Sequence, residues 1–183
     1  MTPHAFTEDQ LCERPALQVL ASLGWETVSA ADEVFGASGT LGRETPGEAV
    51  LVPRLWAALQ RLNPDLPAEA LESVVDQVTR DRSAMSLAAA NREVYDLLKD
   101  GVPVSVADRD RGGQREDRVR VIDWTDPAGN DFLAVSQLSV TGLLYTRRPD
   151  IVGFVNGLPV VVVELKKPGV PARQAFDGNL TAY

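Results

Sequence analysis

Cysteine and histidine are almost missing from this chain of 183 residues, which contains one of each, Cys12 and His4. Disulfides, thiolate zinc sites and Cys/His or Ser/His catalytic pairs all need more of these side chains, so they are nearly excluded. Any bound metal ion must therefore be held by oxygen atoms. Cys12 falls within a helical pattern, where we expect a small core residue rather than a nucleophile.

Long apolar runs are also missing. No run approaches the roughly 20 residues of a membrane span, and the first ten residues lack the basic start and apolar middle of a secretory signal. We therefore expect a cytoplasmic protein with no membrane partner. The composition, 44% apolar and 24% charged, is that of an ordinary globular protein. A chain of this length is most simply one domain, 1–183, which buries roughly 70% of its unfolded surface.

Positive charge is scarce, because the net charge is −8. This argues at first against a nucleic-acid partner, whose phosphates are usually neutralised by basic residues. The charge is uneven, however: residues 140–183 carry five basic and three acidic side chains, a net charge of +2, and the first 139 residues carry −10. A second basic group is interspersed with acids, and it is either a solvated loop or a phosphate contact. Its members are Arg109, Arg111, Arg115, Arg118 and Arg120.

Apolar periodicity divides the chain into a helical part, about 1–100, and a sheet core with a last helix, about 101–183. Helical spacing predicts helices at 7–24, 49–62, 68–80, 83–99 and 172–183. Period-2 alternation predicts strands at 102–106, 118–124, 132–140, 151–156 and 158–165. Together they predict an α/β fold with a mixed central sheet flanked by helices. Since the sequence stops inside a helical pattern, we expect a fragment of a longer subunit.

Two acids and a lysine lie at the ends of the two most apolar predicted strands: Asp150 precedes 151–156, and Glu164 and Lys166 stand at the end of 158–165. Asn156 and Gly157 separate two apolar runs, which predicts a tight hairpin. A two-residue turn places Asp150 opposite Val163, one position from Glu164, so a bulge or a slight shift in register brings the two carboxylates together. Glu164 and Lys166 are two residues apart and project from one face of a strand, whereas Leu165 points oppositely. The consecutive valines 160–163 predict that this strand lies in the middle of the sheet.

This set of side chains suits a magnesium site. Two close carboxylates repel unless a cation lies between them, and Mg²⁺ prefers oxygen ligands while keeping several waters. A metal-bound water becomes a better nucleophile, and Lys166 can position that water or stabilise the charge of a transition state. The alternative is structural: Asp150 caps a turn after Pro149, and Glu164 and Lys166 end a strand as a weak ion pair. Spacing alone leaves both interpretations open.

A family resemblance adds context. The stretch "RRPDIVGFVNGLPVVVVELKKP", residues 147–168, resembles the PD-(D/E)xK nuclease core in the N-terminal part of the restriction (R) subunit of type I restriction enzymes. Further stretches resemble segments of that family in the same order: "TEDQLCERPALQVLASLGW", "LGRETPGEAVLVPRLWAALQRLNPDLP", "DGVPVSV", "VRVIDWTDPAGNDFLAVSQLSV" and "QAFDGNLTAY". The resemblance covers most of the chain and implies a restriction-endonuclease-like layered fold.

The resemblance also implies roles for individual residues. Asp150 and Glu164 correspond to the metal-binding acids and Lys166 to the catalytic lysine, and the backbone carbonyl of Leu165 is a further metal ligand. Glu13 matches a helical acid that joins the metal shell directly or through water, although neighbouring Glu8 competes for that role. Other residues are implied in DNA binding or positioning, namely Asn179 and Tyr183, which stand where the family has a Gln and a Tyr, and Arg148 and Lys167.

For function, the resemblance implies a Mg²⁺-dependent endonuclease that cuts double-stranded DNA after ATP-driven translocation. ATP would bind to motor domains of the same subunit, because no Gly-Lys-Ser/Thr phosphate loop occurs in this chain. The family implies methylation and specificity subunits as partners. The alternative is a non-catalytic docking module with a nuclease-like fold, whose acidic helices between Glu48 and Asp100 form an interface.

Overall fold

The computed structural model describes residues 9–107, 112–142 and 144–178 and divides the chain into two compact units. Unit 1 comprises residues 1–51 and 132–183, and unit 2 comprises residues 52–131. The prediction that 1–183 is one domain stays a prediction.

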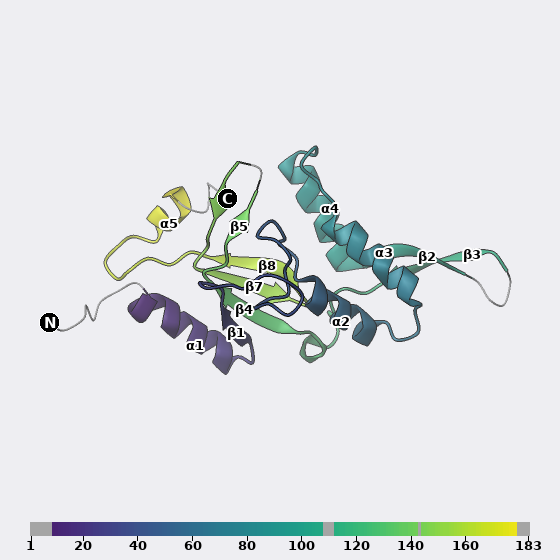
Figure 1. Ribbon diagram of the computed structural model, residues 1–183, viewed down its shortest axis with the longest axis horizontal. Helices are drawn as coiled ribbons and strands as arrows, with labels where there is room; N and C mark the ends of the chain where they lie inside the picture. The colour runs from purple at the N-terminus through teal and green to yellow at the C-terminus, as the bar shows by residue number, and fades with distance from the viewer. Residues whose placement is uncertain (1–8, 108–111, 143, 179–183) are drawn as a thin grey trace. The chain divides into compact units, whose positions relative to one another are not determined.

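Unit 1 is built on a mixed four-stranded sheet with the strand order β1-β4-β7-β8 (Figure 1). Its strands are β1 (Glu26–Ser29), β4 (Phe132–Ser136), β7 (Ile151–Val155) and β8 (Leu158–Val163). β1 runs parallel to β4, whereas β4 with β7 and β7 with β8 are antiparallel. The predicted mixed sheet is confirmed, and β1 is a strand that sequence periodicity missed.

The turn between β7 and β8 has the conformation that its sequence predicts. Asn156 has a φ of 51° and Gly157 a φ of 77°, both in the left-handed region. Positive φ at both central residues is the signature of a type I′ turn, whose twist matches that of the flanking strands. The Asn-Gly pair therefore closes the hairpin without backbone strain.

Both faces of this sheet are covered. On one face, Val135, Val152 and Phe154 belong to a buried apolar cluster that includes Leu51 and Leu138 from the adjoining loops. On the other face, the ring of Trp25 lies so close to Gly153 that a Cβ there would be only 3.1 Å from it. Gly153 therefore allows Trp25 to lie flush against β7, and a larger residue would force the ring away.

The first helix of unit 1 begins irregularly. A π-helical turn (Asp9–Glu13) runs into α1 (Arg14–Ser22), which lies against β1 (Figure 1). Pro15 has no N–H to donate to the carbonyl of Leu11, so the regular hydrogen-bond pattern starts only after this point. Glu13 thus stands at the junction of the two helix types.

The prediction that the valine-rich strand lies in the middle of the sheet is wrong for the part of the chain that the structure describes. β8 pairs with β7 alone and forms an edge of the sheet. Val160, Val161 and Val162 are each more than 40% exposed. An apolar run indicates a buried strand only when strands lie on both sides, and the run itself does not reveal how many neighbours a strand has.

A buried arginine, Arg43, holds the long loop after β1 against the rest of unit 1. Arg43 is completely buried, forms an ion pair with Glu33, and donates hydrogen bonds to the carbonyl oxygens of Glu48 at 2.8 Å and Ser139 at 3.0 Å. A buried guanidinium is tolerated because its charge and its donors are satisfied in this way. The bond to Ser139 fixes the chain shortly after β4.

The remaining elements of unit 1 are short. A small ribbon pairs β5 (Val140–Thr141) with β6 (Thr146–Arg147), and α5 (Arg173–Gly178) follows the sheet. The last helix, predicted at 172–183, is confirmed over its first turns, and its final residues lie outside the described part. β4 is shorter than the predicted 132–140, because the chain turns at Gln137.

The described residues of unit 2, 52–107 and 112–131, form three helices and a two-stranded ribbon. The helices are α2 (Val52–Leu62), α3 (Ala68–Thr79) and α4 (Leu87–Asp100), and the ribbon consists of β2 (Val102–Ala107) and β3 (Gln114–Val119). A 3₁₀ turn (Pro127–Gly129) follows.

The strand predicted at 118–124 is displaced, since β3 ends at Val119. The sequence of β3 is polar and shows no alternation, because most of this strand is exposed to solvent. None of the described helices is long and apolar enough to cross a membrane.

Candidate metal and nuclease site

The β7–β8 hairpin brings Asp150 and Glu164 opposite each other. Val155 pairs with Leu158 and Phe154 with Pro159, but the next pairs are Gly153 with Val161 and Ile151 with Val163. One residue of β8, Val160, is therefore bulged out, and this shifts the register by one position. Continuing the register past Ile151 places Asp150 opposite Glu164. The shift that the carboxylate pair requires is confirmed.

Asp150 is held in place through its side chain and its backbone. One of its carboxylate oxygens, Oδ2, accepts a hydrogen bond of 2.6 Å from the backbone N–H of Leu165. Its main-chain carbonyl accepts another, of 3.0 Å, from the N–H of Gln137. For the other carboxylate oxygen, Oδ1, there is no donor within residues 9–107, 112–142 and 144–178. The half-buried Asp150 is thus orientated and keeps one oxygen for a further ligand.

Glu13 joins this corner through Gln137, a residue that the sequence analysis did not select. The side-chain amide of Gln137 donates a hydrogen bond of 2.7 Å to Oε2 of Glu13. Gln137 has a φ of 56°, which is rare for a residue other than glycine and is found where surrounding structure enforces it. Gln137 therefore connects the acid of the first helix to the backbone of Asp150. The one available signal was a long polar side chain in a predicted strand whose other polar residues are serines.

Lys166 lies close to the start of the first helix. Its backbone carbonyl accepts a weak hydrogen bond from the thiol of Cys12, with the sulfur 3.3 Å from the oxygen. Glu164, Leu165 and Lys166 are all half-buried. β8 ends at Val163, two residues before the predicted end, so strand geometry does not fix the direction of Lys166 relative to Glu164. Their projection from one face stays a prediction.

The carboxylates do not form a compact cluster of three. Within the described part of the chain, no group of three or more His, Cys, Asp or Glu side chains is close enough to hold a metal ion. Mg²⁺ does not require one, because it is often bound by one or two carboxylates together with waters and phosphate oxygens. The oxygen donors of Asp150 and Glu164 fit this hard ion, and soft ligands are missing apart from Cys12.

Some of the predicted site residues have no structural description. Asn179, Tyr183 and Glu8 lie outside the described residues, as do Arg109 and Arg111 of the second basic group. Arg148 and Lys167 are described and are exposed beside the hairpin sequence. The rest of the second basic group has structural partners: Arg115 pairs with Asp117, Arg118 donates to the carbonyl of Gly101, and Arg120 donates to that of Leu62.

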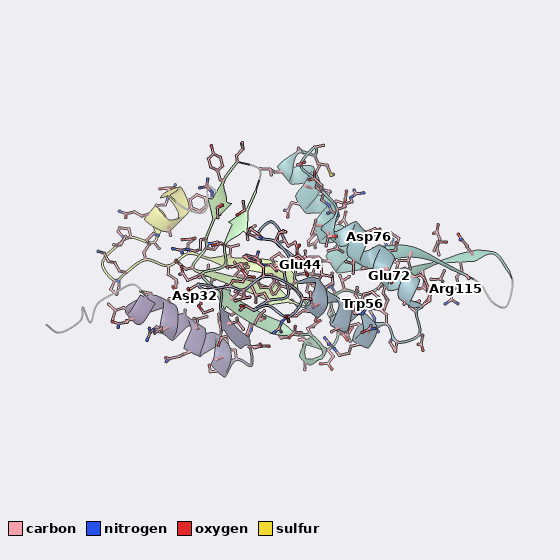
Figure 2. The ribbon with its side chains drawn as sticks, viewed as in Figure 1. Asp32, Glu44, Trp56, Glu72, Asp76 and Arg115 are labelled. Atoms are coloured by element: carbon pink, nitrogen blue, oxygen red, sulfur yellow. The ribbon has the colours of Figure 1, made fainter. Side chains whose placement is uncertain are left out.

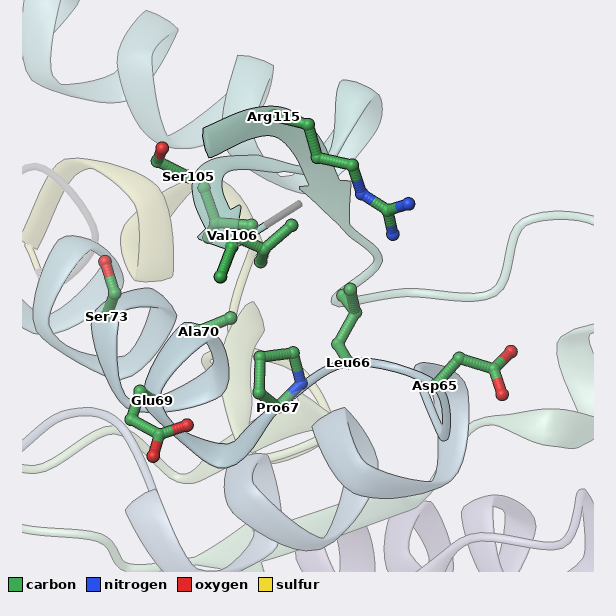
Figure 3. Close-up of a pocket in the computed structure, with 11 residues that line it drawn as sticks. Asp65, Leu66, Pro67, Glu69, Ala70, Ser73, Ser105, Val106 and Arg115 are labelled. Atoms are coloured by element: carbon green, nitrogen blue, oxygen red, sulfur yellow. The ribbon is translucent and has the colours of Figure 1, made fainter. Parts of the chain in front are cut away.

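Unit 2 has hollows of its own, remote in sequence from this corner. A pocket of about 710 Å³ lies between the start of α3 and the β2–β3 ribbon, with Glu69 and Ser73 on the helix and Ser105 and Arg115 on the strands (Figure 3). A groove of about 400 Å³ lies between α2 and α3, and Figure 2 labels Trp56, Glu72 and Asp76 along it. Neither has an arrangement of carboxylates like that around Asp150.

The elements of unit 1, a helix against a mixed sheet with acids and a lysine at one end of its hairpin, define a layered α/β fold of the kind found in nucleases. The family described as "Type I restriction enzyme R protein N terminus" matches residues 5–183. The chain therefore belongs to this family.

Individual relatives agree with the family match. The chain is 40% identical over 157 residues to the type I restriction enzyme HindI endonuclease subunit of Haemophilus influenzae, a match covering 85% of the chain and 14% of that relative. It is 28% identical over 180 residues to the putative type I restriction enzyme MjaIXP endonuclease subunit of Methanocaldococcus jannaschii, covering 95% of the chain and 17% of the relative. The chain thus spans less than a fifth of the length of these relatives.

Proposed function

We propose that this chain is a Mg²⁺-dependent endonuclease domain of the PD-(D/E)xK type that hydrolyses phosphodiester bonds in double-stranded DNA. The observation that carries the proposal is the one-residue bulge at Val160, which shifts the register of the β7–β8 hairpin. Extended by one pair beyond Ile151 and Val163, that register pairs Asp150 with Glu164, two residues before Lys166. Membership of a family of restriction enzyme subunits supports it. An ion pair between a strand-end acid and a lysine would not need the bulge.

In this proposal, Asp150 and Glu164 hold the ion with the backbone carbonyl of Leu165. Bound Mg²⁺ would lower the pKa of a coordinated water and offset charge on the scissile phosphate. Glu13 would contribute directly or through water, and its orientation is set by the amide of Gln137 at 2.7 Å. Lys166 would position the attacking water or stabilise charge in the transition state. Arg148, Lys167, Asn179 and Tyr183 would contact or position DNA.

The proposal includes partners that lie outside this chain. Motor domains of the same subunit would bind ATP and move the DNA, and methylation and specificity subunits would select the site. These assignments rest on the family resemblance, and the relatives, which are endonuclease subunits, extend far beyond the length that the chain covers. Because such an enzyme meets its DNA in the cytoplasm, we place it there.

Lys166→Ala in an intact subunit containing this chain tests the proposal. We expect DNA cleavage to fall by at least about 100-fold, while DNA-dependent ATP hydrolysis continues. Lys99→Ala, which removes an exposed lysine of α4, is the matched control and leaves both activities unchanged. Full cleavage by Lys166→Ala contradicts the proposal, and loss of both activities would mean that Lys166 has a structural role.

A second candidate function is a docking module without catalysis, and the groove between α2 and α3 favours it. The groove combines an apolar floor of Val52, Trp56 and Val75 with the acids Glu72 and Asp76. An apolar strip with an acidic rim suits a protein partner that carries basic residues. If docking were the only function, Trp56→Ala would weaken assembly with the other subunits, and Glu164→Ala would change neither metal binding nor cleavage.

A further inference from the structure

The β5–β6 ribbon presents apolar side chains to solvent. Thr141 and Thr146 pair across the ribbon with their hydroxyl oxygens 2.9 Å apart, and the N–H of Gly142 donates to the carbonyl of Tyr145 at 2.9 Å. Leu144 is 82% exposed and Tyr145 is 64% exposed. A ribbon of two residue pairs buries little surface, so these side chains contribute little to folding stability.

The charge around these side chains is positive. The guanidinium carbon of Arg147 lies 4.9 Å from the ring centroid of Tyr145, a stacked cation–π arrangement. Arg148 follows and is exposed, and the sequence from Gln137 to Pro149 has no carboxylate, although the chain has a net charge of −8. The loop whose Pro46 carbonyl accepts from the N–H of Thr141 at the base of the ribbon carries two acids, Glu44 and Glu48. The tip itself is basic.

The ribbon also leads directly into the candidate site. Arg148 and Pro149 are the only residues between β6 and Asp150. Two intervening residues span at most about 10 Å, so a phosphate bound by these arginines would lie near the carboxylates. A polyanionic chain that reaches the site would therefore pass the ribbon.

We propose that the tip of the β5–β6 ribbon, formed by Leu144, Tyr145 and Arg147, is a duplex-DNA contact beside the cleavage site. Arg147 binds a backbone phosphate, and the exposed ring and leucine pack against sugars or the edges of bases in the adjoining groove. Proteins that hold DNA beside a reaction site combine basic residues with aromatic or apolar side chains in this way. The inference rests on the proposed DNA-cutting function, and it assigns a contact for the DNA outside the metal site.

Unit 2 offers a matched set of control positions on α4. Tyr95 is 58% exposed with the ammonium of Lys99 at 5.8 Å from its ring centroid, and Leu87 is 91% exposed. Tyr145→Ala, Arg147→Ala and Leu144→Ser can thus be compared with Tyr95→Ala, Lys99→Ala and Leu87→Ser. Each pair removes the same kind of side chain, one from the ribbon tip and one from an acidic helix.

The experiment measures binding of a fluorescent duplex by anisotropy, with EDTA present so that no cleavage follows, at several salt concentrations. We expect Tyr145→Ala and Arg147→Ala to weaken binding about 10-fold, with Arg147→Ala lowering the salt slope by about one, whereas the α4 variants change affinity less than about 2-fold. Five of the six positions are exposed and Arg147 is half-buried, so melting temperatures should change little, and measuring them excludes misfolding as a cause.

Three kinds of outcome overturn the inference alone. If the wild type binds DNA and the tip and α4 variants lose equal affinity, or neither set loses affinity, the ribbon is not a DNA contact. Unchanged DNA binding with weaker assembly onto the other subunits would make the tip a protein interface instead. A wild-type chain that binds no DNA at any salt concentration contradicts both the inference and the proposed function. If Glu164→Ala loses Mg²⁺ binding while the tip variants bind DNA normally, the proposed function stands and the ribbon is not a DNA contact.

Discussion

Charged side chains serve different purposes in the two units. In unit 2, Asp131 accepts from Arg54 at 3.0 Å and Glu93 from Arg82 at 2.9 Å. Unit 1 also contains such pairs, but its Asp150 accepts from the neutral backbone N–H of Leu165. A carboxylate bonded to a guanidinium is already neutralised, whereas one bonded to an amide retains its charge for an added cation. Asp131 and Glu93 are therefore committed to ion pairs, whereas the charge of Asp150 remains available to a cation.

The strongest way to break this comparison is Asp150→Asn. The asparagine oxygen can still accept from Leu165, so the fold should persist while the negative charge is lost. We expect Mg²⁺ affinity, measured by calorimetry, to fall by at least about 100-fold. The matched change in unit 2, Asp131→Asn, removes the charge that faces Arg54 and leaves Mg²⁺ affinity unchanged. Equal Mg²⁺ affinities for the wild type and Asp150→Asn would contradict the assignment.

Asn63→Leu tests the structural character of polar groups in unit 2. Asn63 is buried, donates to the carbonyls of Leu59 and Arg120, and accepts from the N–H of Arg120 at 2.9 Å. Replacing it leaves buried backbone groups of Arg120 without a partner, which should lower the free energy of unfolding by about 2 kcal/mol in urea. Mg²⁺ affinity of the folded protein should not change. A loss of metal binding in folded Asn63→Leu would mean that the units do not divide their roles in this way.

Gln137 allows the side chain and the backbone to be tested separately. Gln137→Gly removes the amide that holds Glu13 and relieves the strain of a φ of 56°, whereas Gln137→Ala removes the same amide and keeps that strain. We expect both variants to bind Mg²⁺ about 5-fold more weakly, because Glu13 loses its orientation. The alanine variant should also be less stable than the glycine variant by about 1 kcal/mol. Wild-type affinity in both variants would show that Glu13 does not contribute to the site.

The smallest expected effect is a loss of folding stability at low pH. Backbone N–H groups of Asp126 and Thr125 lower the pKa of Asp123, and the backbone N–H and hydroxyl of Ser83 lower the pKa of Asp81. A lowered folded-state pKa gives stability that is present above the unfolded value of about 3.9 and is lost as pH falls through the folded value. Urea unfolding should therefore show stability declining below about pH 4, less steeply in Asp123→Asn. A decline of the same slope in this variant would exclude Asp123 as a cause.

Much of unit 1 could be predicted from local patterns. Asn156 and Gly157 specified the hairpin because few other residues adopt positive φ twice in succession, and the alternation around them located β7 and β8 within two residues. The pairing of Asp150 with Glu164 was predicted only as the consequence of a bulge. Its position at Val160 depends on packing that no local pattern contains.

Features that depend on neighbours distant in sequence could not be predicted. The valine-rich β8 looks like a central strand but lies at an edge, since the number of neighbouring strands is a property of topology. Gln137 looks like a strand residue, and only its left-handed backbone and its bond to Glu13, 124 positions earlier, reveal its place in the site. β1 was missed because its four residues are mostly exposed and show no alternation.

The most direct measurement is a Mg²⁺ titration of this chain followed by NMR, with Glu164→Ala beside the wild type and Glu69→Ala in unit 2 as the control. The account predicts saturable shifts of the amides of Gln137, Leu165 and Lys166 in the wild type and in Glu69→Ala, and their loss in Glu164→Ala. Spectra that are indifferent to Mg²⁺, or shifts that persist unchanged in Glu164→Ala, would contradict it.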